Sequence, residues 1–109
     1  MNVTIEKQGD ATIVRPTGRL DFGASAGFQE ELGAAIAGGS ARVVIDASAL
    51  EYVSSAGLRA FLVGARAAKS AGISLAICCL SANVREVFQV SGFDRLVPVK
   101  DTLAEAMAA

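Results

Sequence analysis

Apolar and polar positions follow two different periods along the chain, and these periods predict its secondary structure. Residues 3–6 alternate between apolar and polar, Gly9-Asp10 supplies a turn, and residues 11–15 resume the strand pattern. Two such runs around a glycine-containing turn are typical of an antiparallel β-hairpin. Pro16 and Gly18 limit the regularity of the second strand, and they favour an edge position or a bulge there.

Beyond the hairpin, helical and strand patterns alternate. Residues 21–25 are expected to form a loop before a first helix, which ends at Gly38-Gly39. The continuous apolar runs 42–45 and 73–80 predict strands buried on both faces, and residues 96–99 predict a short last strand. Three more helices are predicted. One ends at Gly72, and one lies between Ser81 and Gly92 with Val84, Val87 and Phe88 as its apolar stripe. The final helix begins with the capping box of Thr102 and Glu105.

The predicted order of elements is therefore ββαβαβαβα. Strands that alternate with helices indicate parallel pairing with right-handed crossovers. We expect a single α/β domain over residues 1–109, in which helices pack against a mixed sheet that begins with the antiparallel hairpin and continues with parallel strands. Between the third strand and the second helix, Leu50, Tyr52 and Val53 are expected to anchor a loop, with Glu51 facing water.

Composition narrows the classes of function. Hydrophobic residues make up 52% of the chain, as in a globular domain with its own core, and 10 basic against 11 acidic residues give a net charge of -1. A chain without basic excess is not expected to bind nucleic acid or an anionic membrane directly. No basic stretch followed by an apolar run opens the sequence, and no apolar run approaches the ~20 residues that span a bilayer. We expect a cytoplasmic protein without membrane insertion, and a monomer because no large apolar stripe stands out.

The chain contains no histidine, which excludes a Ser-His-Asp site and a zinc site with histidine ligands. Its two cysteines, Cys78 and Cys79, are adjacent and lack the two-residue spacer of a redox or zinc pair. Adjacent side chains of a strand point to opposite faces, so a disulfide between them would be strained. They are expected to be small core residues of a reduced protein, with a redox sensor as the alternative. Neither a metal site nor a cofactor is predicted.

Two adjacent hydroxyls, Ser54 and Ser55, lie where a loop turns into the second helix. A helix start has free N–H groups and a positive dipole end, so a serine there can cap the helix or can carry a phosphate. One serine suffices for the cap, which leaves the other hydroxyl free. Gly57, two residues further on, lacks a side chain and is expected to leave room for a kinase active site or a partner backbone.

Two acidic residues follow predicted strands. Asp46 ends the third strand, where a carboxylate can be catalytic or can bind the N–H groups of its own loop in an Asx-type turn. No second acid, base or ligand set accompanies it, which favours the turn. Asp21 follows the second strand and is expected to reach the same end of the sheet as Asp46.

The element order and one segment resemble the anti-sigma factor antagonists of the STAS domain family. The segment is Asp46-x-Ser48-x-Leu50-x-Tyr52-Val53-Ser54-Ser55-Ala56-Gly57-Leu58, and Arg19-Leu20-Asp21 and Val90-Ser91-Gly92-Phe93 also match the habits of the family. The resemblance runs along essentially the whole chain. One departure stands out: the common pattern Asp-Ser-Ser/Thr-Gly is replaced by Ser54, Ser55 and Ala56 before Gly57. The acidic residue is missing, so that Ser54 remains a competing phosphoacceptor.

The resemblance implies a partner-switching protein without catalytic residues. In this family an anti-sigma factor, itself a serine kinase with a histidine-kinase-like ATPase fold, phosphorylates a serine at the start of the second helix, and a PP2C-type phosphatase restores the unphosphorylated form. Alignment on the glycine and leucine assigns the phosphoacceptor to Ser55. The implied partner-binding surface comprises Asp21, Ser54, Ser55, Ala56, Gly57 and Arg59.

Two other functions remain open at this point. The same fold also serves as a regulatory subunit of membrane transporters or lipid-transport complexes, independently of phosphorylation. A small enzyme that uses Asp46 or Cys79 is the third possibility. It is disfavoured because no general base, metal-ligand set or cofactor loop accompanies these residues.

Overall fold

A computed structural model describes residues 1–109 and confirms the predicted α/β class. Strands β1 (Asn2–Gln8) and β2 (Ala11–Leu20) form the predicted antiparallel hairpin. Strands β3 (Arg42–Asp46), β5 (Ser74–Cys78) and β6 (Val99–Lys100) continue the sheet in parallel, in the order β1-β2-β3-β5-β6. The hairpin therefore forms one side of the mixed sheet, and the last strand of the chain, β6, forms the opposite edge.

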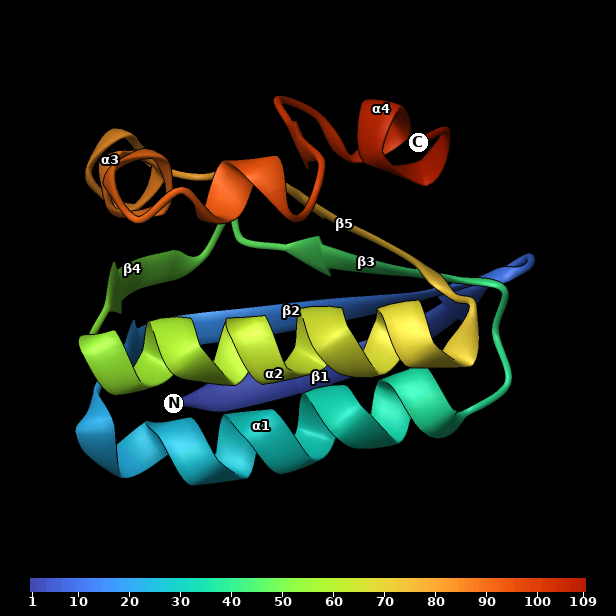
Figure 1. The fold of residues 1–109 in the computed structure, drawn as a ribbon, viewed down its shortest axis with the longest axis horizontal. Coiled ribbons are helices and arrows are strands. Elements are labelled where there is room, and N and C mark those ends of the chain that lie inside the picture. Colours follow the sequence, from blue (N-terminus) through green and yellow to red (C-terminus); the bar gives the residue numbers. More distant parts are fainter.

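Helices cover the sheet unequally. Helices α1 (Phe22–Ala37) and α2 (Ser55–Ala71) lie side by side along one face (Figure 1). The short helix α4 (Leu103–Met107) packs against β3, β5 and β6 on the opposite face. Helix α3 (Ala82–Val90) and the 3-10 helix η1 (Phe93–Arg95) lie between β5 and β6 in the chain, and α3 packs against a further strand, β4 (Leu50–Val53).

A fourth strand, β4 (Leu50–Val53), stands where the sequence predicted a loop, and that prediction is wrong. Strand β2 is ten residues long, so its first half pairs with β3 and its last residues pair in parallel with β4. Gly18 makes the change of partner possible, because its φ of +101° belongs to a bulge where the register shifts. The predicted irregularity of β2 is thereby confirmed, although β2 is an inner strand of the sheet.

The main core consists of 21 buried residues between the sheet and helices α1, α2 and α3. Four phenylalanine rings meet at its centre: Phe61 of α2 lies 4.9 Å from Phe28, 5.2 Å from Phe88 and 6.1 Å from Phe93, measured between ring centroids. This aromatic cluster joins α1, α2, α3 and η1, because each of them contributes one ring. It holds the start of α2 in a defined position relative to α3 and η1.

Several predicted boundaries and faces need correction. Helix α1 begins at Phe22, because Asp21 already caps it, so that residues 22–25 are not a loop. The last strand is Val99–Lys100 instead of 96–99, since residues 93–95 form η1 and Leu96 is left 62% exposed. Leu50 and Val53 are buried as expected and Glu51 is exposed, but Tyr52 is 38% exposed and lies under the guanidinium of Arg19. Val87 is on the exposed side of α3, whereas Val84 and Phe88 are buried.

Candidate functional site

The N-terminal ends of α1 and α2 lie next to each other at one edge of the molecule (Figure 1). The register of the parallel pair β2–β4 explains this, because Leu20 pairs with Val53 and the next residue of each strand is a helix N-cap. Asp21 caps α1, and Ser54 caps α2. The positive dipole ends of α1 and α2 therefore lie at the same edge of the molecule. A negatively charged group is favoured at such an edge.

Both the side chain and the backbone N–H of Ser54 form hydrogen bonds within the fold. Its Oγ accepts a hydrogen bond of 3.0 Å from the backbone N–H of Gly57, and its own N–H donates to the carbonyl oxygen of Leu20 at 2.9 Å. The predicted capping role of Ser54 is confirmed. Ser55, the first residue of α2, is exposed, and its hydroxyl has no hydrogen-bond partner within the chain. The structure thus leaves Ser55 as the accessible hydroxyl of the pair.

Gly57 does not leave room for a partner, so this sequence-based interpretation is wrong. Gly57 is buried, and a Cβ atom added to it would lie 2.7 Å from Cγ and 2.8 Å from the carbonyl oxygen of Leu20. The missing side chain therefore lets the first turn of α2 approach the end of β2. Gly57 packs against Leu20 under the helix start and does not belong to the exposed surface.

A groove of about 280 Å³ opens beside Ser55. Ser55 and Arg59 line it from α2, one helical turn apart, and so do Leu58 and Leu62. The opposite wall comes from a segment beyond α3 in the chain and consists of Ser91, Phe93 and Leu96. Sequence reasoning missed the role of Leu96. In the sequence, only the resemblance to the family points to the segment Val90-Ser91-Gly92-Phe93.

The other predicted surface residues surround Ser55. Asp21 is exposed, and its Oδ1 accepts from the N–H of Ala24 at 3.0 Å, so it caps α1 besides lying beside the α2 start. Ala56 is half-buried and Arg59 is exposed. Phe22 follows Asp21 and is 84% exposed, which makes it the most exposed large apolar side chain. The sequence predicts a loop at Phe22 and does not single out its exposed ring.

Asp46 forms the predicted Asx-type turn. Its Oδ1 accepts from the N–H of Ser48 at 3.1 Å, and its Oδ2 accepts from Nε of Arg15 at 3.2 Å. Burial alone would raise the pKa of Asp46, but these hydrogen bonds and the charge of Arg15 outweigh burial and lower it. Arg15 also pairs with Glu6, and this hydrogen bond raises the pKa of Arg15. Asp46 is thus an ionised structural group.

Replacing Asp46 by asparagine is expected to lower the free energy of unfolding by about 1 kcal/mol at pH 7, since Arg15 is 34% exposed and solvent screens the pair. The pKa of Asp46 is lower in the folded than in the unfolded chain, so its contribution is present above about pH 4 and is lost as the pH falls through the folded-state pKa. Urea unfolding of both proteins at pH 7 and pH 3, in buffer with a metal chelator, measures this. A difference that stays constant or grows toward pH 3 would contradict the prediction.

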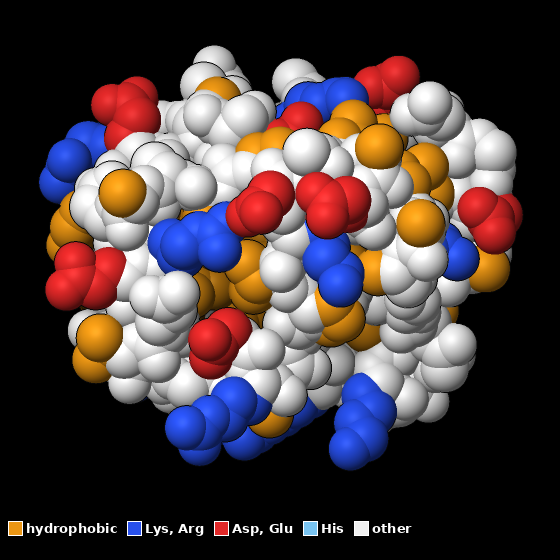
Figure 2. Space-filling model, turned by 90° about the horizontal axis from the view of Figure 1, so that it is seen from above, with side chains coloured by type: hydrophobic (Ala, Val, Ile, Leu, Met, Phe, Trp, Pro, Cys, Tyr) orange, Lys and Arg blue, Asp and Glu red, His pale blue; other side chains and the backbone are white.

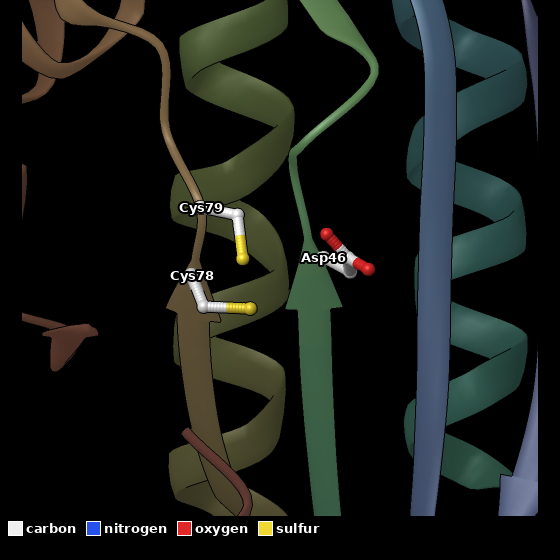
Figure 3. Close-up of side chains that lie close together, drawn as sticks. All are labelled: Asp46, Cys78 and Cys79. Carbon is white, nitrogen blue, oxygen red and sulfur yellow. The ribbon is translucent and has the colours of Figure 1, made fainter. Parts of the chain in front are cut away.

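The cysteines differ from expectation in one respect. Cys78 is a buried core residue, as predicted, and burial together with the neighbouring Cys79 raises the pKa of its thiol to about 12. Strand β5 ends at Cys78, and Cys79 has a φ of +66°, in the left-handed region. The rule that adjacent side chains point to opposite faces therefore does not apply, and both sulfur atoms lie on the same side, toward β3 (Figure 3).

Charges of both signs are interspersed with hydrophobic atoms on the face that carries α3, η1 and α4 (Figure 2). No field of a single sign dominates this view, in keeping with a net charge of -1. No helix in the structure is both long enough and apolar enough to cross a bilayer.

The fold and site define a small α/β domain that presents an exposed serine at a helix start. A family model described as the STAS domain matches residues 2–106, and the chain belongs to this family. It is 36% identical over 109 residues to BtrV of Bordetella bronchiseptica, which is named as an anti-sigma factor antagonist, and the match covers all of this chain and 94% of that protein. The resemblance found from the sequence is thereby confirmed.

Solved structures of anti-sigma factor antagonists share the fold. A protein of Thermotoga maritima assigned to this class superposes with a TM-score of 0.90 at 21% identity, over 97% of this chain and 92% of that one. The anti-sigma factor antagonist SpoIIAA in its unphosphorylated form gives a TM-score of 0.81 at 23% identity, over 97% and 93%. A sulfate transporter family protein of Wolinella succinogenes also has this fold, with a TM-score of 0.79 at 17% identity, over 91% and 83%.

Proposed function

We propose that this protein is an anti-sigma factor antagonist that binds an anti-sigma factor kinase when Ser55 is unphosphorylated and releases it when Ser55 carries a phosphate. One observation carries the proposal: of the two serines at the start of α2, Ser54 is used as the cap and Ser55 is exposed beside a groove. The 36% identical relative BtrV, named as an anti-sigma factor antagonist, supports the same class.

The physical basis is a local change of charge. A phosphate adds about -1.5 to -2 charges and strong acceptor oxygens at pH 7. The starts of α2 and α1 tolerate this charge, and Arg59, one turn after Ser55, is within the reach of an i,i+4 pair. The fold itself therefore need not change. A partner surface fitted to a neutral hydroxyl meets added bulk, added charge and a desolvation cost instead.

The partner set follows from this mechanism. The kinase is the anti-sigma factor, with a histidine-kinase-like ATPase fold, and a PP2C-type phosphatase restores the binding-competent form. Exposed apolar side chains beside Ser55, above all Phe22 and Leu96, supply contact area for the kinase. The protein acts by binding in the cytoplasm and needs neither catalytic residues nor a cofactor of its own for this role. One copy of the chain suffices for it.

Phosphate mapping tests the proposal. The protein is incubated with ATP and an anti-sigma kinase encoded by the same genome, and phosphopeptides are located by mass spectrometry. We expect one phosphate on Ser55, none in Ser55→Ala, and an unchanged phosphate on Ser55 in the matched control Ser54→Ala. Phosphate that moves to Ser54 would show that the accessible hydroxyl was misassigned. No phosphate on either serine, together with unchanged kinase binding by Ser55→Asp, would favour the phosphorylation-independent regulatory subunit of a transporter.

A further inference from the structure

Three side chains with metal-binding atoms meet at the carboxyl ends of β3 and β5, away from Ser55. Asp46 and Cys78 are register partners in the parallel pair, and Cys79 follows directly. One carboxylate oxygen and the two sulfur atoms all lie within 4.8 Å of one another (Figure 3). The left-handed backbone of Cys79 creates this arrangement, because it turns the second sulfur to the side of the first.

We propose that Asp46, Cys78 and Cys79 form a binding site for Zn²⁺. Two thiolates and one carboxylate are ligands that this cation accepts, with bonds of about 2.3 Å to sulfur and 2.0–2.2 Å to oxygen. Ligand atoms in such a tetrahedron lie about 3.5–3.8 Å apart, as these bond lengths require. Donor atoms already within 4.8 Å reach that spacing by small side-chain rotations. Three protein ligands leave the fourth position to water.

The groups around the three ligands fit this cation. Asp46 is held by the N–H of Ser48 and by Arg15, and Arg15 is in turn held by Glu6. Such outer partners orient a ligating carboxylate. Binding breaks the two S–H bonds, forms two S–Zn bonds and passes both protons to solvent. The cation with two thiolates and one carboxylate then carries one net negative charge, and the guanidinium of Arg15, which also pairs with Glu6, lies beside it.

The burial of the neighbouring side chains indicates from which side a metal ion can reach the three ligands. Cys78 is fully buried beside Val44 and Ala76 of the sheet and under Ala106 of α4, so its sulfur is closed from that side. Cys79 is half-buried and Asp46 is 8% exposed, which leaves an approach from the end of the strands. A bound cation would connect β3 to β5 and would stabilise the folded chain over the unfolded one. The site stands independently of the proposed phosphorylation of Ser55.

Zinc titration of the full-length, fully reduced protein tests the site, with a chromogenic chelator as competitor and thermal unfolding as a second readout. We expect one Zn²⁺ per chain and a higher Tm with metal. Because the chain has only two cysteines, any thiolate-to-metal charge-transfer absorption on Co²⁺ substitution must come from this pair. Cys79→Ser and Asp46→Asn are each expected to weaken Zn²⁺ binding at least about tenfold, as loss of ligands or their partners does in other metal sites.

The control variant is Asp21→Asn, which removes an exposed carboxylate elsewhere and is expected to leave Zn²⁺ affinity unchanged. Cys79→Ser changes one atom of a half-buried side chain, so circular dichroism should show a folded chain. Zinc affinity that is the same in Cys79→Ser, in Asp46→Asn and in the unmodified protein would overturn the proposal. Binding below one equivalent at micromolar zinc would also overturn it.

Discussion

Phosphorylation of Ser55 is expected to lower the affinity for the anti-sigma kinase about a hundredfold, which corresponds to about 2.7 kcal/mol. The reason is the position of the hydroxyl: it is exposed beside a groove lined by Arg59 and Leu96, so the phosphate would enter the contact surface itself. Titration calorimetry of the kinase against the unmodified and the phosphorylated protein measures the difference. Thermal unfolding of the two forms should be nearly equal, because a helix start accommodates an anion.

Two aspartate variants test whether kinase binding depends on a negative charge at Ser55 or on any added negative charge nearby. Ser55→Asp is expected to weaken kinase binding in the same direction as phosphate, but less, because it adds one charge and fewer acceptor oxygens. Ser54→Asp adds the same charge one residue earlier, at a position where aspartate is as good an N-cap as serine. It should bind within a few-fold of the unmodified protein. Equal losses for both variants would mean that binding responds to general charge and not to Ser55.

Replacing Gly57 by alanine is expected to lower the free energy of unfolding by about 1–3 kcal/mol, although alanine is the better helix former. The new Cβ would lie 2.8 Å from the carbonyl oxygen of Leu20, and backbone cannot move aside as a flexible side-chain end can. The helix start would shift away from β2, and the hydrogen bond from Ser54 to Leu20 would lengthen. Chemical denaturation measures the loss, and kinase affinity should fall as well because Ser55 moves with the helix.

Gly33→Ala is the matched control for this substitution. Gly33 lies inside α1, and nothing stands within 4 Å of an added Cβ. Alanine there is expected to raise stability by roughly 0.5–1 kcal/mol, since it removes the entropic disadvantage of glycine in a helix. The two variants should therefore change stability in opposite directions. A Gly57→Ala protein as stable as Gly33→Ala would contradict the packing of α2 against Leu20.

Local signals in the sequence predicted much of this site correctly. The serine pair at a loop-to-helix junction indicated one cap and one free hydroxyl, and the structure assigns the cap to Ser54. Asp46 after an apolar run indicated an Asx-type turn, which the bond from Ser48 confirms. These predictions succeed because a cap or a turn depends on bonds between residues two or three positions apart, which a short stretch of sequence contains.

Contacts between distant segments account for what sequence reasoning missed. The role of Gly57 depends on Leu20, 37 positions earlier, and β4 exists because the long strand β2 has a second half to pair with. The wall of the groove formed by Phe93 and Leu96 reaches Ser55 only through the packing of η1 beside α2.

The sequence by itself determined the alternation of strands and helices, the caps and the presence of an unengaged serine, since these depend on periodicity and neighbouring residues. Only the tertiary structure decided which surface surrounds Ser55, and that the cysteines and Asp46 share one side of the sheet. A single left-handed residue, Cys79, reversed the direction expected for a strand side chain. The parallel register then brought its sulfur beside a carboxylate more than thirty positions away.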